Sequence, residues 1–234
     1  MRIIFVRHGD PDYENDRLTE EGKLQAEATA KRLKDEGITR ILSSPMGRAC
    51  ETASYTADLL GLPIEKLDFM HEIRWGNPTG DEIMREGHPW TLGYKLFCES
   101  RSRADLEKWR EHPYFKENKC VEYYDMIADK MDKLMEELGY VRKDGRYYCV
   151  RENRETIAIF SHGGSGACAL SHLLDINFIY MIAAMTYGLC SVSVVNLPAD
   201  VGLFVVPRIE LYNDMAHVPA AKYAKVRFDA KTFL

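Results

Sequence analysis

Two histidines stand directly before glycines, each at the end of a short apolar segment. Arg7-His8-Gly9 follows residues 3–6, and His162-Gly163-Gly164 follows residues 156–161. An imidazole keeps one ring nitrogen unprotonated near neutral pH and can act as a nucleophile, while an arginine offers a planar fork to phosphoryl oxygens. Glycine amides at the start of a helix also bind anions. The two segments therefore indicate an anion site, and phosphate is the anion that suits it best.

Both apolar segments are predicted to be buried strands of one sheet. Each consists mostly of β-branched or aromatic residues and is too short for a helix. In open α/β sheets, ligands bind beyond the carboxyl ends of the strands. His8 and His162 are therefore expected to meet at one sheet edge, although each alone has a simpler explanation as a hydrogen-bonded residue at a strand end.

A second arginine follows another predicted strand, residues 39–43. Ser44-Pro45 predicts a helix start, with Ser44 as N-cap and Pro45 at the first helical position. Arg48 then falls in the first turn, where a helical side chain leans back toward the N-terminus. Alone it would more often be a surface residue, but at this place it can join Arg7 at an anion.

The remaining pattern predicts further helices and an insertion. Thr19 is the expected N-cap of a helix that Gly37 ends, and Gly61 is expected to end the helix that Ser44 starts. Residues 77–125, rich in proline, tryptophan and charge, are interpreted as a mostly helical insertion over the site. An amphipathic helix over residues 124–138 is expected to return to the main body.

The C-terminal third is expected to complete the sheet. Asp144-Gly145 predicts a hairpin, a helix is expected from Ser165, residues 191–197 and 202–207 read as closing strands, and residues 213–217 as a late loop. The predicted fold is α/β: a mostly parallel sheet with one antiparallel strand, helices on both faces, and the helical insertion over the active site.

Composition limits the function classes. The 234 residues, 46% of them hydrophobic, suffice for one α/β domain over residues 1–234. The net charge of −5 argues against a general nucleic-acid or membrane-surface binder. Six cysteines lie without a CxxC pair, so no zinc site or disulfide framework is expected, and Cys168 with His172 offers too few metal ligands. With neither a signal peptide nor a long apolar run, a cytoplasmic location is expected.

Further motifs extend the pattern in order along the chain. They are Leu18-Thr19-x-x-Gly22-x-x-Gln25-Ala26, Ser43-Ser44-Pro45-x-x-Arg48-Ala49-x-x-Thr52 and Glu72-x-x-x-Gly76. Together with the two histidine motifs, the series resembles the histidine phosphatase superfamily, the phosphoglycerate-mutase-like group, and within it the phosphatase branch. The resemblance spans roughly residues 2–76 and 156–217.

The resemblance implies a metal-independent phosphatase of the histidine acid type, which hydrolyses a phosphomonoester through a phosphohistidine. In that scheme His8 attacks phosphorus, and Arg7, Arg48 and His162 stabilise the transferred group. Glu72 protonates the leaving oxygen and then activates water. The implied partner is a small phosphorylated substrate, and no metal or cofactor is expected.

Other contacts are less strongly indicated. The amide of Gly163 is expected to bind phosphate, and Tyr13, Asn15, Arg74 and Trp75 are candidates for substrate binding. The sequence leaves open which phosphorylated substrate is used and which oligomeric state the chain adopts.

A phosphoglycerate mutase is the first alternative, because it would share the site and return the phosphoryl group to a bound intermediate. The mutase branch commonly carries asparagine where this chain has Gly164, and glycine is expected to leave room for water. Glu14 stands at the offset of another asparagine of that branch, where a carboxylate should repel a bisphosphorylated intermediate. Both differences favour the phosphatase.

Two further alternatives remain. A serine esterase would use Ser165 in Gly163-Gly164-Ser165-Gly166-Ala167, with Asp175 or Asp214 and His217 completing a triad. That motif has alanine where the nucleophile elbow has its last glycine, and it leaves the arginines without a role. A non-catalytic binding protein of this fold would keep the pocket, but the intact set of motif residues argues against it.

Overall fold

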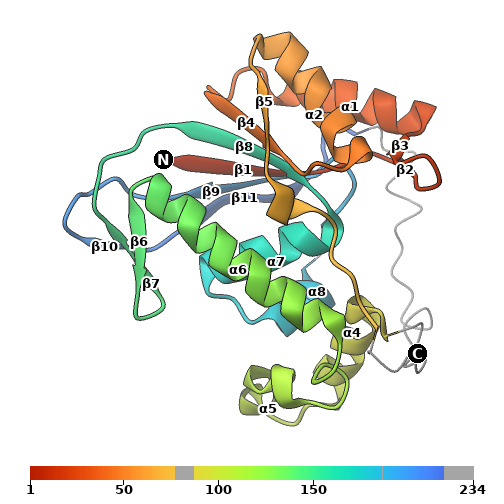
Figure 1. Ribbon diagram of the computed structural model, residues 1–234, viewed down its shortest axis with the longest axis vertical. Helices are drawn as coiled ribbons and strands as arrows, with labels where there is room; N and C mark the ends of the chain where they lie inside the picture. The colour runs from red at the N-terminus through yellow and green to blue at the C-terminus, as the bar shows by residue number, and fades with distance from the viewer. Residues whose placement is uncertain (77–86, 186, 219–234) are drawn as a thin grey trace.

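A six-stranded sheet forms the centre of the computed structural model, which describes residues 1–76, 87–185 and 187–218 (Figure 1). The strand order is β11-β9-β1-β8-β4-β5. The bounds are β1 (Arg2–Arg7), β4 (Arg40–Ser43), β5 (Ile64–Lys66), β8 (Thr156–Ser161), β9 (Val192–Asn196) and β11 (Arg208–Asp214). β1, β8, β4 and β5 pair in parallel, whereas β9 is antiparallel to both β1 and β11. The predicted α/β class with a mostly parallel sheet is confirmed.

The parallel register decides where the site can form. Arg7 lies beside Ser161 at the ends of β1 and β8, and Ser43 of β4 lies beside Phe160. The carboxyl ends of these three strands therefore share one edge, and the residues that follow each of them emerge there together.

Helices cover both faces of the sheet, because the side chains of β1 alternate between two cores. Ile4 and Val6 join one core, with α1 (Glu20–Leu33) and α2 (Gly47–Leu60) above it. Ile3 and Phe5 join the other core. That face carries α6 (Lys119–Glu137), α7 (Gly163–Leu174) and α8 (Phe178–Ala184), and Figure 1 shows α1 and α2 on the opposite side from α6 and α7.

Smaller elements complete the described chain. They are the hairpin β2 (Pro11–Asp12) and β3 (Arg17–Leu18), the 3₁₀ turns η1 (Asp68–Met70) and η2 (Trp109–Glu111), the helices α4 (Pro89–Glu99) and α5 (Arg103–Glu107), and a second sheet of β6 (Tyr140–Lys143), β7 (Arg146–Cys149) and β10 (Phe204–Val205). α4 packs against α8, and Figure 1 shows it with α5 at the end of the molecule away from α1 and α2. Residues 77–86 of the expected insertion lie outside the described residues. No helix in the described ranges has the length and apolar character to cross a membrane.

Most expected element ends are present. Oγ1 of Thr19 accepts a hydrogen bond from the Gly22 amide and caps α1, and Gly61 ends α2 in the left-handed region with φ 65°. Asp144 and Gly145 both have positive φ, as a two-residue hairpin between β6 and β7 requires. The first helix ends earlier than expected, at Leu33, and the turn after it contains Gly37 with φ 70°.

Three expected boundaries are wrong. Ser44 is not the N-cap of α2: Met46 takes that position, and the Gly47 amide donates to the Asp16 carboxylate at 2.7 Å, so a distant loop caps the helix. α7 begins at Gly163 rather than Ser165, directly after His162. The expected late loop over residues 213–217 is partly strand, because pairing with β9 extends β11 to Asp214.

Candidate active site

His8 lies just past the end of β1, and only 1% of its surface is exposed. Its Nδ1 is 2.7 Å from the carbonyl oxygen of Gly9, and a carbonyl can only accept, so Nδ1 carries the proton. On the other side of the ring, Nε of Arg48 donates to Nε2 at 3.3 Å. Burial, followed by the charge of Arg7, lowers the pKa of His8 to about 3. His8 is therefore neutral at neutral pH, with its lone pair on Nε2.

His162 follows β8 and stands as N-cap of α7, fully buried. Its ring centroid is 5.1 Å from that of His8. Nε2 lies 2.7 Å from the Ser44 hydroxyl, and if that hydroxyl donates, Nδ1 holds the proton. Burial, followed by the neighbouring His8 and the charges of Arg48 and Arg7, lowers the pKa of His162 to about 2. A neutral His162 in this tautomer is a hydrogen-bond donor rather than a second nucleophile.

Two guanidiniums flank the histidines. Arg7 Nη1 donates to the Tyr187 carbonyl at 2.6 Å, and its buried Nε has no hydrogen-bond partner among the described residues. Arg48, in the first turn of α2 and 4% exposed, pairs through Nη1 with Asp16 Oδ1 at 2.5 Å. Both positive charges act on both imidazoles and lower their pKa values, and such a concentration of positive charge suits a phosphoryl group.

Glu72 follows η1, and one of its carboxylate oxygens is held by hydrogen bonds from backbone amides. Its Oε1 accepts from the amides of Ile73 at 2.9 Å, Gly164 at 2.9 Å and Ser165 at 3.2 Å. Among the described residues nothing donates to Oε2, which leaves that oxygen for proton transfer. Burial raises the pKa of the Glu72 carboxyl, and the amide bonds and the charge of Arg7 oppose that rise only in part.

Gly164 serves a different purpose from the one expected. A Cβ atom at this position would lie 2.5 Å from Oε1 of Glu72 and 2.3 Å from Cγ1 of Ile73. The space that glycine leaves is therefore filled by Glu72 and Ile73, and the expectation that it admits water is wrong. A larger residue would displace the carboxylate.

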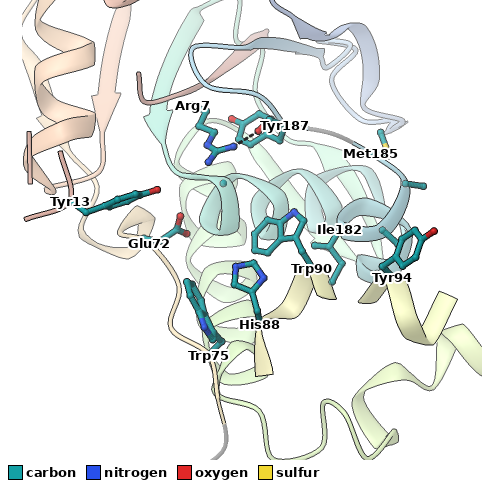
Figure 2. A pocket seen from close by; sticks show the side chains of 13 residues that line it. Arg7, Tyr13, Glu72, Trp75, His88, Trp90, Tyr94, Ile182, Met185 and Tyr187 are labelled. Atoms are coloured by element: carbon teal, nitrogen blue, oxygen red, sulfur yellow. Dashed lines mark hydrogen bonds between the residues drawn. The ribbon is translucent and has the colours of Figure 1, made fainter. Parts of the chain in front are cut away.

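A cavity of about 570 Å³ opens above these groups (Figure 2). Its lining residues are Arg7, Tyr13, Glu72, Trp75, His88, Trp90, Tyr94, Gly163, Ile182, Ala183, Ala184, Met185 and Tyr187. Arg7, Glu72 and Gly163 form its polar end. His8, Arg48 and His162 are each less than 5% exposed and lie beneath that end.

The structure brings most of the predicted site residues together. His8, His162, Arg7, Arg48, Glu72 and Gly163 gather at the sheet edge, and Tyr13 and Trp75 line the cavity. Asn15 does not join them, because its side chain donates to Asp12 at 2.8 Å in an exposed turn. Arg74 is exposed and is not part of the lining.

The esterase triad is not assembled. The Ser165 hydroxyl donates to the Met70 carbonyl at 3.0 Å and accepts from the His162 amide. His217 lies with Nε2 at 3.1 Å from the Thr29 hydroxyl and at 3.0 Å from the Cys190 carbonyl, and neither candidate aspartate contacts Ser165. The serine esterase interpretation is therefore wrong.

Several residues that contribute to the site were not predictable from a sequence motif. Asp16 holds Arg48, the Ser44 hydroxyl orients His162, and Trp90 from α4 enters the cavity. Of these three residues, only Trp90 belongs to a segment that the sequence predicts over the site, residues 77–125. Across the described ranges, no group of three or more metal-ligating side chains is present.

The amino-acid sequence was compared with models of known protein families. Residues 3–209 match the model of the histidine phosphatase superfamily (branch 1). The chain belongs to this superfamily. The resemblance predicted from the motifs is therefore confirmed over nearly the whole chain.

Among curated proteins, the probable phosphoglycerate mutase GpmB of Yersinia pestis (strain Pestoides F) is 32% identical over 102 residues. That match covers 38% of this chain and 47% of the relative, so the chain spans about half the length of the curated relatives it matches.

Solved structures of the superfamily show the same fold across almost the full length. A mycobacterial glucosyl-3-phosphoglycerate phosphatase in complex with inorganic phosphate superposes with a TM-score of 0.61 at 20% identity, covering 93% of this chain and 99% of its own. The phosphoserine phosphatase of Entamoeba histolytica in complex with 3-phosphoglyceric acid gives 0.62 at 18% identity, with the same coverage. The superfamily member is thus similar in fold to phosphatases and in part of its sequence to a mutase.

Proposed function

We propose that this superfamily member is a metal-independent phosphomonoesterase that forms a phosphohistidine at His8. The observation that carries the proposal is the state of the His8 ring. Nδ1 is held by the Gly9 carbonyl, and the unprotonated Nε2 faces Arg48 at the edge of the sheet. A histidine in this tautomer needs no base to become a nucleophile.

In the first step, Nε2 of His8 attacks phosphorus in line and the bond from phosphorus to the alcohol oxygen breaks. A proton on Oε2 of Glu72 goes to that oxygen, so the alcohol leaves neutral. The arginine donors and His162 stabilise the charge on the equatorial oxygens, as loose phosphoryl transfer requires.

In the second step, water attacks phosphorus, Glu72 takes its proton, and the bond from nitrogen to phosphorus breaks. Inorganic phosphate leaves and the first state of Glu72 returns. Burial supports this cycle because it raises the pKa of Glu72 and so favours the acid form relative to an exposed glutamate. The acid-phosphatase type of activity is proposed on that ground.

Arg48 has to change partner when substrate binds. Without ligand, its Nε donates to the lone pair that must attack. An incoming phosphoryl group offers this donor oxygen atoms instead, while the Asp16 carboxylate on Nη1 keeps the guanidinium near the site. Asp16 is thus proposed as a positioning residue for Arg48.

A phosphoglycerate mutase remains the second candidate, because part of the chain is similar to the probable mutase GpmB. A mutase must retain a bisphosphorylated intermediate, which needs cations for its second acidic group. Arg7 is the one arginine or lysine among the described residues that line the cavity. This scarcity of positive charge supports release of phosphate rather than return of the phosphoryl group.

We also propose the domain organisation, the class of substrate and the cellular location. Residues 1–234 are proposed to form one domain, with the segment around residues 77–125 as a cap; Trp90 and Tyr94 of this segment line the cavity. Its partner is proposed to be a small phosphorylated molecule. All six cysteines are free thiols, which supports a reducing, cytoplasmic setting.

One assay separates the two candidates. The purified protein is given 3-phosphoglycerate and a panel of monoesters, with and without 2,3-bisphosphoglycerate. We expect inorganic phosphate from monoesters with no need for the bisphosphate. Efficient interconversion of 3- and 2-phosphoglycerate with little phosphate released would establish the mutase instead.

A further inference from the structure

The part of the cavity beyond the phosphate-binding groups is aromatic. The ring of Trp75 lies 4.7 Å from that of His88, at 66° between the planes. The His88 ring is in turn 5.3 Å from that of Trp90. Figure 2 shows these three rings in succession below and to the right of Glu72, with Arg7 above Glu72. A substrate whose phosphate meets Arg7 would therefore extend its alcohol portion along aromatic surfaces.

A second part of the lining is apolar and comes from α8, which packs against α4. Ile182, Ala183 and Ala184 of α8 and Met185 after it line this side. α8 cannot move away from the ring-bearing helix α4 freely, because the two pack closely at Gly93. A Cβ atom at position 93 would lie only 2.5 Å from Cδ1 of Ile182. The apolar compartment is therefore formed before substrate arrives, which reduces the cost of binding an apolar group.

The charged arginine and carboxylate groups of the described lining residues are all near the phosphate end. Among the described lining residues, Arg7 is the one arginine or lysine and Glu72 the one carboxylate, and both are assigned to phosphoryl transfer. Arg74 is exposed outside the lining. A carboxylate or second phosphate on the substrate would lose its hydration here without gaining a dedicated cation.

We propose that the preferred substrate is the phosphate monoester of an alcohol bearing an aromatic or similarly apolar group. This inference rests on the proposed phosphatase function. The apolar group packs among Trp75, Trp90 and Ile182, while the phosphate enters between Arg7 and the buried histidines. Phosphorylated hydroxy acids, amino acids and polyols are correspondingly poor substrates.

The test compares primary alkyl phosphates, so that the leaving alcohol differs in shape and charge more than in reactivity. Phosphate release is measured from 2-phenylethyl phosphate, glycerol 3-phosphate, O-phosphoserine and 3-phosphoglycerate. We expect kcat/KM for the phenylethyl ester to exceed the other three by on the order of tenfold or more, mainly through KM.

Variants locate the preference in the cavity. Trp90→Ala should lower kcat/KM for the phenylethyl ester about tenfold and change that for glycerol 3-phosphate less than threefold. Phe204→Ala, which removes an exposed ring on the distant second sheet, is the matched control and should change neither value. His88→Phe keeps an aromatic ring without the ring nitrogens, so the preference should persist.

A binding measurement guards against a variant that fails to fold. In His8→Ala protein, which cannot turn over by the proposed route, titration calorimetry should show tighter binding of 2-phenylethyl phosphate than of glycerol 3-phosphate. Equal affinities, or a higher kcat/KM for phosphoserine or 3-phosphoglycerate, would overturn the aromatic preference while leaving the phosphatase intact. No phosphate from any monoester would overturn the phosphatase proposal, and the binding comparison would still decide the preference.

Discussion

Arg48 donates Nε–H to Nε2 of His8 across 3.3 Å, although the two residues lie 40 positions apart. β1 and β4 both belong to the parallel part of the sheet, with only β8 between them, and α2 begins close behind β4. The first turn of α2 therefore delivers the guanidinium to the nitrogen proposed to attack phosphorus. The same Nε–H of Arg48 can also donate to the phosphoryl oxygens. Arg48 can therefore both orient the nucleophile His8 and stabilise the transferred phosphoryl group.

Replacing Arg48 by lysine should therefore be severe. An ammonium group is a single point of charge and cannot contact His8, Asp16 and a phosphoryl oxygen through one planar fork. We expect kcat to fall on the order of ten- to thousand-fold, the range for loss of one transition-state donor. Arg103→Lys on the exposed surface of α5 is the matched control and should leave kcat unchanged. A near-wild-type rate for Arg48→Lys would remove Arg48 from the mechanism.

Glu72→Gln should affect substrates according to their leaving group. Glutamine can still accept from the backbone amides but cannot give a proton to a departing alkoxide. We expect a loss of on the order of a hundredfold or more for alkyl phosphates. The loss should be much smaller for p-nitrophenyl phosphate, whose leaving group needs little protonation. Equal losses for both would show that Glu72 does not act as the acid.

The pH profile follows from the two shifted groups. His8 is neutral well below neutral pH, because its pKa is lowered to about 3, so nucleophile protonation should limit only strongly acidic reactions. The pKa of Glu72 is raised, and the acid form is lost as pH rises through that value. Alkyl ester hydrolysis by wild type should therefore decline on the alkaline side, and Glu72→Gln should lack that decline. A decline of equal size and position in the variant would contradict the assignment.

Gly164→Ala should damage the site although it adds a single methyl group. The new Cβ would stand within 2.5 Å of Oε1 of Glu72, so the carboxylate must leave its amide contacts. We expect kcat for alkyl phosphates to fall about tenfold or more with the circular dichroism spectrum unchanged. Gly163→Ala offers a graded comparison, since its Cβ would meet Arg7 at 3.4 Å, ordinary contact, and should cost less. An unchanged kcat for Gly164→Ala would show that Glu72 tolerates displacement.

Local pattern was sufficient to predict which residues reach the sheet edge. The short apolar runs before His8 and His162 are strands because of their length and composition, and parallel pairing brings their ends together. Capping by Thr19 was likewise predictable, because the capping hydroxyl and the Gly22 amide that donates to it lie within one turn.

Contacts between segments that are distant in the sequence could not be predicted from local sequence patterns. Ser44 has the right type for an N-cap, but His162 engages its hydroxyl and Asp16 caps α2 from another loop. The Asn15 side chain donates a hydrogen bond to the nearby Asp12 and does not line the cavity. Trp90 lies in a segment without a motif, and only the packing of α4 on α8 brings its ring to the site.

The phosphohistidine at His8 is the central claim, and trapping it is the most direct test. The protein is mixed with a monoester carrying radiolabelled phosphate, quenched within one turnover, digested and mapped. We predict a label that is labile in acid, stable in alkali and confined to the peptide containing His8, and no label in folded His8→Ala protein. Label on Ser165, or full activity of His8→Ala, would contradict the account.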